Sequence, residues 1–450
     1  MTPRTVVKRS ANKQRPKVAQ EFNLSIDDVR AVIKRLGSPK WLADRRLKAW
    51  QSYQGIPMPT LEDEPWRRTD IRMLPSQSVE LKPADELAVD PELLTSLTGD
   101  QSPAQIVLRP GHDIESDGLE TLADQGVIFC DWKMAERDHS DLLKQYMGKV
   151  VADDEGKFSA LAAAMSEHGI LIYVPKGVQL DTPLHSVLWA PGSGLLSFSR
   201  VLVIIEDGAS ANYLHEMASP TEAEGSAVHD SIMEIWLGDN ANLTFVEVQN
   251  WGEHVWNFTH ERSRVGRDSN LKWIFGSVGG HLTKTFTELD LVGEGSSGQM
   301  SGFYFVDGSQ HLDQDTQQNH LAPHTTSDLL FKGGLIDKAR SVWQGMIYVA
   351  PGAQKTDGYQ ANRNLILSDH ARADSIPGLE ILADDVRCTH GATISQLEEE
   401  PIFYLMSRGL PRDEAERLVV DGFFTPIMDR IPFENVRARF ARMIDDKMSS

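Results

Sequence analysis

Short turn-forming segments recur through the middle of this chain at intervals of roughly 30 residues, and they constrain its fold more than any other feature. Each combines Gly with Asp, Asn, Ser or Ala. Gly, Asp and Asn tolerate the left-handed backbone that a tight corner requires. Strands of about five residues joined by such corners predict a β-solenoid, although an antiparallel sandwich fits the same spacing. The corners are residues 206–209, 238–241, 266–269 and 293–296, and the β-prone runs are 170–174, 201–205, 242–248, 271–275, 302–306 and 364–367.

Helical patterns precede and follow this repeat region. Two amphipathic segments at 25–37 and 39–55 each end at a glycine, and a further helical candidate lies at about 137–150. Near the C-terminus, helical patterns occur before Gly409, after Pro411 and after Pro432. The sequence therefore predicts four parts: a basic tail at 1–19, a helical and mixed region at 20–165, a β core at 166–395 and a helical region at 396–450.

Composition excludes several classes of protein. The formal net charge of −20 argues against generic nucleic-acid binding, which depends on Lys and Arg set against phosphates. No apolar run approaches the roughly 18 residues that a membrane-spanning helix requires. The chain has only two cysteines, Cys130 and Cys388, so no disulfide framework supports the fold, and a reducing cytoplasm fits best.

The first 19 residues carry six basic side chains and no acidic one. This composition predicts a disordered, solvated tail. A transit peptide for a plastid-type organelle is the alternative, and it is disfavoured because Pro3 and Pro16 interrupt any amphipathic helix.

Motifs of common enzymes are missing from the sequence. We find no phosphate-binding Gly-x-x-x-x-Gly-Lys-Ser/Thr, no Gly-x-Ser-x-Gly, no His-Glu-x-x-His and no Cys-x-x-Cys. The sequence therefore predicts no nucleotide site and no all-cysteine metal site built from one copy of the chain. We expect a non-catalytic protein.

The segment 384–391 is the best candidate for chemistry. If it is a strand, alternation puts Asp384, Val386, Cys388 and His390 on one face. A thiolate and an imidazole two residues apart could share a metal such as iron or zinc. The alternative is that Cys388 is a small buried apolar residue and His390 a hydrogen-bonded strand residue.

His320 and His324 form a second candidate pair. Their spacing suits two ligands on one helix face, but Pro323 lies between them and opposes a helix. We therefore expect two ordinary surface histidines in a loop.

Several longer segments resemble the SufD-type subunits of the SUF iron–sulfur cluster assembly scaffold. The C-terminal match at 379–393 and its continuation at 403–410 are the most specific, and the likeness spans roughly residues 40–440. The resemblance implies a mainly β fold, with a right-handed parallel β-helix core flanked by N- and C-terminal helical regions. The remaining matching segments are 65–70, 172–178, 349–357 and 362–365.

The same resemblance implies a function and partners. It implies a non-catalytic scaffold subunit that pairs with a SufB-type paralogue, while a SufC-type ABC ATPase docks on the C-terminal helical region. A nascent iron–sulfur cluster would be bound transiently at the subunit interface. The histidine that the family contributes matches His390, and Cys388 would have a supporting role.

Two alternatives remain beside this interpretation. A SufB-like homodimeric scaffold is disfavoured because segments 216–220 and 369–373 lack the cysteines that SufB would carry there. A β-helix carbohydrate-active enzyme could use Asp384 and Asp385 as paired acids, but adjacent strand residues point to opposite faces.

Overall fold

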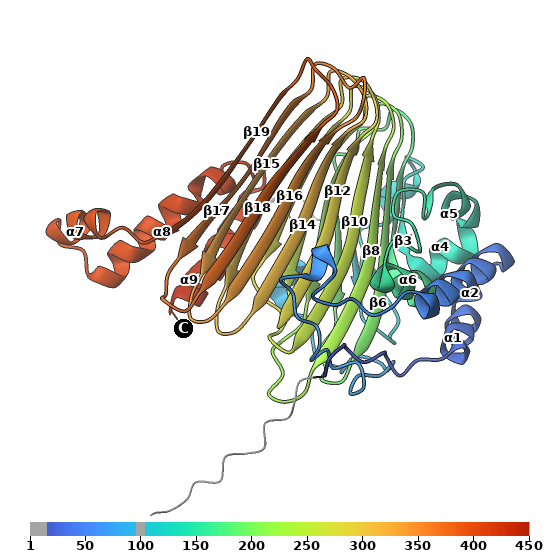
Figure 1. The fold of residues 1–450 in the computed structure, drawn as a ribbon. Coiled ribbons are helices and arrows are strands. Elements are labelled where there is room, and N and C mark those ends of the chain that lie inside the picture. The colour runs from blue at the N-terminus through green and yellow to red at the C-terminus, as the bar shows by residue number, and fades with distance from the viewer. Residues whose placement is uncertain (1–15, 96–103, 450) are drawn as a thin grey trace, which may run out of the picture.

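The computed structural model describes residues 16–95 and 104–449. Most of the predicted basic tail, residues 1–15, therefore lies outside the described residues. The described chain forms a stack of β coils with helices at both ends of the sequence (Figure 1).

Two sheets wind around one interior, and from β4 onward successive strands alternate between them. Neighbouring strands are parallel, except for the antiparallel pairs at the start of each sheet. The nine-stranded sheet contains β3 (Ile128–Asp131), β4 (His168–Val174), β6 (Leu196–Ile205), β8 (Ala227–Leu237), β10 (Val255–Val265), β12 (Leu282–Leu291), β14 (His311–His320), β16 (Arg340–Val349) and β18 (Arg372–Ile381). The ten-stranded sheet contains β2 (Glu115–Asp117), β1 (Ala104–Leu108), β5 (Leu184–Trp189), β7 (Ser210–Ala218), β9 (Asn242–Asn250), β11 (Asn270–Ser277), β13 (Ser297–Val306), β15 (Thr326–Leu335), β17 (Asp357–Ile366) and β19 (Arg387–Gln396).

The register of these strands gives the repeat length. Trp256 lies opposite Leu282, 26 residues later in the chain. Leu196 lies opposite Val228, 32 residues later. Parallel pairing at this offset confirms the predicted parallel β-helix and rules out the antiparallel sandwich for the core.

The four predicted corners all connect a strand of the nine-stranded sheet to the next strand of the ten-stranded sheet. One residue of each has a positive φ, for example 68° at Gly208 and 56° at Asn240. The backbone N–H of each left-handed residue donates to a carbonyl of the following corner, as from Gly208 to Asp239 at 2.8 Å and from Asn240 to Arg267 at 2.7 Å. The same ladder continues through Asp268, Gly295, His324 and Lys355.

The predicted strand length of about five residues was wrong, because most core strands have eight to eleven residues. Polar interior residues such as His229, Asn257 and Glu261 interrupt the apolar runs from which the strands were predicted. These side chains are buried because hydrogen bonds within the interior satisfy most of them, for example His229 to Asn257 at 2.8 Å.

The N-terminal helices cover the outer face of the nine-stranded sheet along its first strands (Figure 1). Helix α1 starts at the predicted cap Ser25 and ends at Gly37, which has a φ of 68°. The predicted helix at 137–150 is instead two short helices, because His139 has a non-helical backbone between them. The elements of this region are α1 (Ile26–Leu36), α2 (Lys40–Gly55), η1 (Glu64–Trp66), η2 (Pro91–Leu94), α3 (Glu120–Ala123), α4 (Trp132–Asp138), α5 (Ser140–Tyr146) and α6 (Lys157–Met165).

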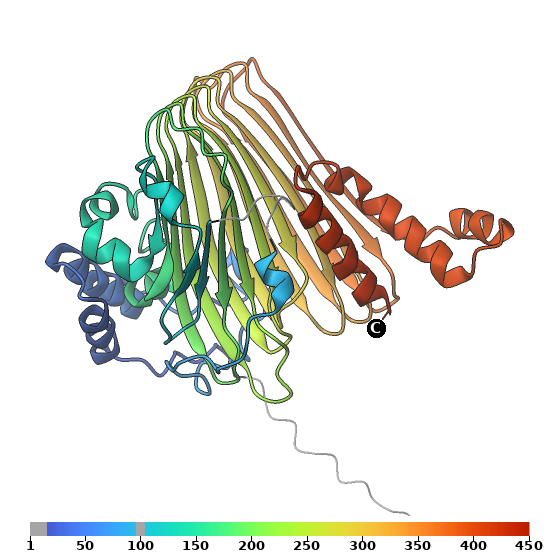
Figure 2. The same ribbon diagram turned by 180° about the vertical axis from the view of Figure 1, so that it is seen from behind.

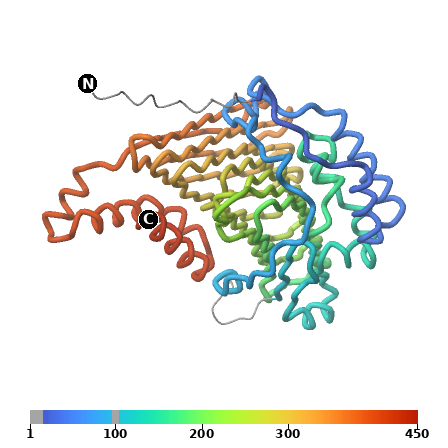
Figure 3. Tube along the Cα trace, turned by 90° about the horizontal axis from the view of Figure 1, so that it is seen from below, coloured from blue at the N-terminus to red at the C-terminus, as the bar shows by residue number. Residues whose placement is uncertain are grey.

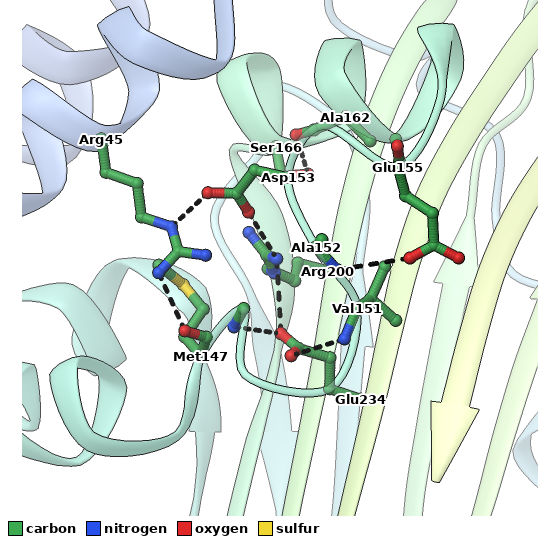
Figure 4. Close-up of polar contacts among 12 residues, drawn as sticks. Arg45, Met147, Val151, Ala152, Asp153, Glu155, Ala162, Ser166, Arg200 and Glu234 are labelled. Atoms are coloured by element: carbon green, nitrogen blue, oxygen red, sulfur yellow. Dashed lines mark hydrogen bonds and ion pairs between the residues drawn. The ribbon is translucent and has the colours of Figure 1, made fainter. Parts of the chain in front are cut away.

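A buried polar network fastens this helical layer to the sheet (Figure 4). Glu234, fully buried on the outer face of β8, accepts backbone N–H bonds from Gly148 at 2.8 Å and Val150 at 3.2 Å. Arg200 lies 3.3 Å from Glu234 and 3.4 Å from Asp153, which also pairs with Arg45 of α2. A chain of alternating charges therefore joins the helical layer to β6 and β8.

The C-terminal helices α7 (Glu399–Ser407), α8 (Arg412–Met428) and α9 (Glu434–Ser449) follow β19. Helices α8 and α9 pack on the outer face of the ten-stranded sheet (Figure 2). There the rings of Phe424 and Phe440 contact the ring of Phe303. Helix α7 extends away from the coils (Figures 1 and 3). None of the helices in the described ranges combines the length and apolar character that crossing a membrane requires.

Candidate functional site: the open end of the coil stack

The last coil consists of β18 and β19, and each of these ten-residue strands pairs with a single earlier strand. Their other edges face outward from the stack. Side chains at positions that are buried in earlier coils are exposed here: Leu379 and Ile381 by 38% each, and Ile394 by 51%. Among the described residues, the stack therefore ends in an uncapped edge of backbone groups and apolar side chains, which we call the open end.

His390 and Cys388 lie on the inner face of β19. Cys388 is in register with Gly358 of β17, and His390 is in register with Gln360. Gln360 points into the interior, because its Nε2 donates to the carbonyl of Gly378 in the opposite sheet at 2.8 Å. In-register residues of parallel strands share a face, so both candidate residues point towards the interior of the last coil.

Cys388 is half-buried beside an apolar cluster that includes Ile347 and Val349. Burial raises the pKa of its thiol above the usual value, and the nearby Asp357 acts in the same direction. The interior beside it is tightly packed at Gly358, where an added Cβ would lie only 3.3 Å from both Cys388 Sγ and His320 Nε2. Cys388 therefore remains a thiol at neutral pH unless a cation or metal stabilises its thiolate.

His390 is exposed, and within the described ranges its imidazole forms no hydrogen bond or ion pair with another residue. It lies beside Cys388 on the inner face, two positions further along β19. An exposed, unpaired imidazole on a rigid strand can bind a metal or a partner without first breaking an internal contact.

The strand expected at 384–391 begins only at Arg387, so this part of the prediction was wrong. Asp384 and Asp385 lie in the corner between β18 and β19, where Asp385 forms an ion pair with Lys355. Asp is itself a common turn residue, so two adjacent Asp residues favour a turn over a continued strand. The two acids are therefore not cooperating carboxylates on a strand.

The expectation for His320 was also wrong. His320 ends β14 and is fully buried, with Nδ1 2.7 Å from Thr325 Oγ1 and Nε2 2.8 Å from Ser327 Oγ. His324 is exposed in the following corner, as expected. Across residues 16–95 and 104–449, no group of three or more His, Cys, Asp and Glu side chains is arranged to hold a metal ion.

Gln360 was not recognised from the sequence. It precedes His390 by 30 residues, which is close to the repeat length, and this offset is the signal that could have found it. The amide is fully buried, and its Oε1 has no hydrogen-bond partner among the described residues.

Comparison with known proteins identifies the family of this chain. Residues 188–423 match the family model of the SufBD core domain of the SUF system for FeS cluster assembly, and residues 17–185 match the SufBD N-terminal region. The iron–sulfur cluster assembly protein SufD of Bacillus subtilis is 31% identical over 94% of this chain and 98% of its own length. An iron–sulfur cluster assembly SufBD family protein of Staphylococcus saprophyticus is 30% identical over 92% of this chain and 91% of its own length.

A parallel β-solenoid with terminal helices and a match to both models defines the class of protein. The chain belongs to the SufBD family of iron–sulfur cluster assembly proteins. Within this family, it is a homologue of SufD. The resemblance inferred from the motifs is thereby confirmed.

Proposed function

We propose that this chain is a non-catalytic scaffold subunit that pairs through its open end with a SufB-type paralogue and holds a nascent iron–sulfur cluster there. The observation that carries the proposal is the uncapped last coil, with His390 on its inner face. The complex works in the cytoplasm, where reducing conditions keep free thiols intact.

The open end supports pairing with a partner of the same fold. Long unpaired strand edges are templates for further strands and lead to aggregation when they stay uncovered. The exposed Leu379, Ile381 and Ile394 add apolar area that a partner would bury. A paralogous coil stack presents the complementary strand spacing and apolar face.

His390 is the ligand that this chain supplies to the cluster, which is the cargo of the complex. His390 and Cys388 offer two donor atoms at most, whereas a whole iron–sulfur cluster is held by about four protein ligands, so the partner provides the others. The raised pKa of Cys388 makes it the weaker donor, and its role is to shape the inner face beside His390.

The C-terminal helices are the docking place of a SufC-type ABC ATPase, and this chain binds no nucleotide. Helix α7 carries large exposed side chains, with Phe403 exposed by 72% and Tyr404 by 56%. Exposed aromatic residues on a projecting helix are typical of a helix that docks into a groove of a partner. Helices α8 and α9 are packed on the sheet and would transmit movement of the ATPase to the coils.

The test uses the complex as it is isolated under native conditions without oxygen. We expect a SufB-type paralogue and a SufC-type ATPase to copurify with the chain, and His390→Ala to lower iron per assembled complex several-fold. Because His390 is exposed, the melting temperature should change little. The control is Thr389→Ala, which removes an exposed side chain from the outer face of the same strand.

Recovery of the chain with a second copy of itself and no paralogue would contradict the proposed pairing and favour the homodimeric scaffold. Equal iron in the His390→Ala and wild-type complexes would reject the ligand role of His390. A fall in melting temperature that matches the loss of iron would assign His390 a structural role instead.

A further inference from the structure

Three register pairs in the described strands join a histidine to an amide side chain in a neighbouring coil. They are His185 with Gln105, His229 with Asn257, and His390 with Gln360. Neighbouring strands are about 4.8 Å apart, so in-register side chains on one face lie directly against each other. This spacing lets an imidazole and an amide meet without strain.

In the two pairs within the stack, ring and amide are in contact. His229 Nδ1 lies 2.8 Å from Asn257 Oδ1, and His185 Nδ1 lies 2.9 Å from Gln105 Nε2. The amide nitrogen of Asn257 is already used, because it donates to Gln249 Oε1 at 3.0 Å. Asn257 Oδ1 is therefore an acceptor, and it fixes the proton of His229 on Nδ1.

The orientation of the Gln360 amide is also determined by its hydrogen bonds. Its Nε2 faces the carbonyl oxygens of Gly378 at 2.8 Å and Gly345 at 3.5 Å. Carbonyl oxygens only accept, so the nitrogen must face them and the orientation of the amide is determined. Oε1 is left buried without a partner among the described residues, and an unsatisfied buried carbonyl is costly.

The third pair thus has a buried acceptor on Gln360 and an unpaired imidazole on His390. We propose that Gln360 is the positioning residue of His390: its Oε1 accepts an N–H from the His390 ring and fixes the tautomer that leaves the other ring nitrogen free. The contact itself is independent of the proposed ligand role of His390, and only its effect on cluster binding rests on that role. A histidine ligand needs a hydrogen-bond acceptor for its second nitrogen, which fixes the ring orientation.

The test measures the contact on the full chain without any cluster. Histidine labelled with ¹⁵N reports the tautomer of each ring through the chemical shifts of its two nitrogens, and His390→Gln identifies the signals of His390. We expect one dominant His390 tautomer in the wild type. Gln360→Met keeps the volume but removes the acceptor, so the two His390 nitrogens should move towards the averaged shifts of a free imidazole. Gln360→Glu, in the protonated form that burial against the Gly378 carbonyl favours, keeps both a donor to that carbonyl and an acceptor oxygen, and it should restore the wild-type pattern.

Gln318→Met is the matched control. Gln318 is also fully buried with an unpartnered Oε1 among the described residues, but its register partners are Leu289 and Ile347. It should leave the His390 signals unchanged. Identical His390 signals in the wild type and Gln360→Met would overturn the proposal, whatever the iron content of the complex.

A second measurement separates this contact from the function proposed above. Iron per assembled complex should fall in Gln360→Met and recover in Gln360→Glu, because the ring orientation is lost and regained. A changed His390 tautomer with unchanged iron would keep the contact and contradict the ligand role of His390.

Discussion

At the scale of single residues, the interior near the open end depends on the missing side chain of Gly358. An added Cβ would lie 3.3 Å from each of three atoms: Cys388 Sγ, His320 Nε2 and Ile347 Cγ2. His320 is held from both ring nitrogens by Thr325 and Ser327, so it cannot move aside without losing a hydrogen bond. The glycine therefore separates a buried neutral imidazole from the thiol beside the candidate ligand.

We expect Gly358→Ala to lower the free energy of unfolding by about 1–2 kcal/mol, because overpacking outweighs the smaller gain from restricting the unfolded chain. Chemical denaturation of the full chain measures this loss. The control is Gly391→Ala in β19, where nothing lies within 4 Å of the added Cβ, and where stability should hold or rise slightly. Equal effects of the two substitutions would show that packing at Gly358 is not tight.

At the scale of elements, the corners were the most predictable part of the chain and the strand ends the least. At Gly208 and Asn240, the residue type alone predicts the left-handed backbone that the structure has there. Strand ends are set by pairing with coils about 30 residues away. Polar interior residues such as Asn257 interrupt the apolar pattern from which strand ends would be predicted. Gln360 was missed for the same reason, since its relation to His390 exists only once the register is known.

The attachment of α9 to the sheet gives a prediction at this scale. Arg439 of α9 is buried and lies 2.8 Å from the carboxylate of Glu216 on β7, which also contacts His185 at 3.0 Å. Arg439→Met should destabilise the fold by about 3–5 kcal/mol, because it leaves a buried carboxylate unpaired. Calorimetry or denaturation of the full chain measures the change.

Adding Glu216→Gln to Arg439→Met should recover part of that loss, because the unpaired charge is gone. Arg442→Ala is the control, since Arg442 is 54% exposed and lies 3.8 Å from an exposed Glu92. This substitution should cost less than about 1 kcal/mol. A double variant no more stable than Arg439→Met would show that packing, and not charge, holds α9.

At the scale of the whole molecule, the interior holds histidines in their neutral form. Burial lowers the pKa of His229 to about 4 and that of His215 to about 3. An unfolded chain binds these protons near pH 6.5, whereas the folded chain resists them until lower pH. Each such histidine therefore adds nothing to the pH dependence at neutral pH and weakens the fold as the pH falls below about 6.5.

We expect the difference in unfolding free energy between the wild type and His229→Gln to shift by about 3 kcal/mol in favour of the variant from pH 6.5 to pH 4. Denaturation series at several pH values measure it, and buried carboxyls with raised pKa, such as Glu261, cancel in the comparison. His370→Gln changes an exposed corner residue and should leave the pH dependence unchanged. Parallel curves for wild type and His229→Gln would contradict this account.

The choice between a solenoid and a sandwich also belongs to this scale. The spacing of strands along the chain does not determine which strands pair, so local sequence patterns were compatible with both folds. The resemblance of the longer motifs to a known family favoured the solenoid. His390 could be chosen from those motifs, but its exposure follows from a fact about the whole molecule: β19 is the last strand of the stack.

The position of β19 at the end of the stack also follows from the order of synthesis. A ribosome makes the coils in order, and each new coil covers the edge of the one before it, so an unfinished edge moves along the growing chain. Helix α7 follows β19 and extends away from the coils, and α8 and α9 pack on the outer face of the ten-stranded sheet, so the described helices leave the open end uncovered. In the finished protein, the strand edge beside His390 therefore stays unpaired, whereas the edge of each earlier coil is unpaired only until the next coil forms. A partner that covers this edge takes the place of the next coil, supplied by another chain.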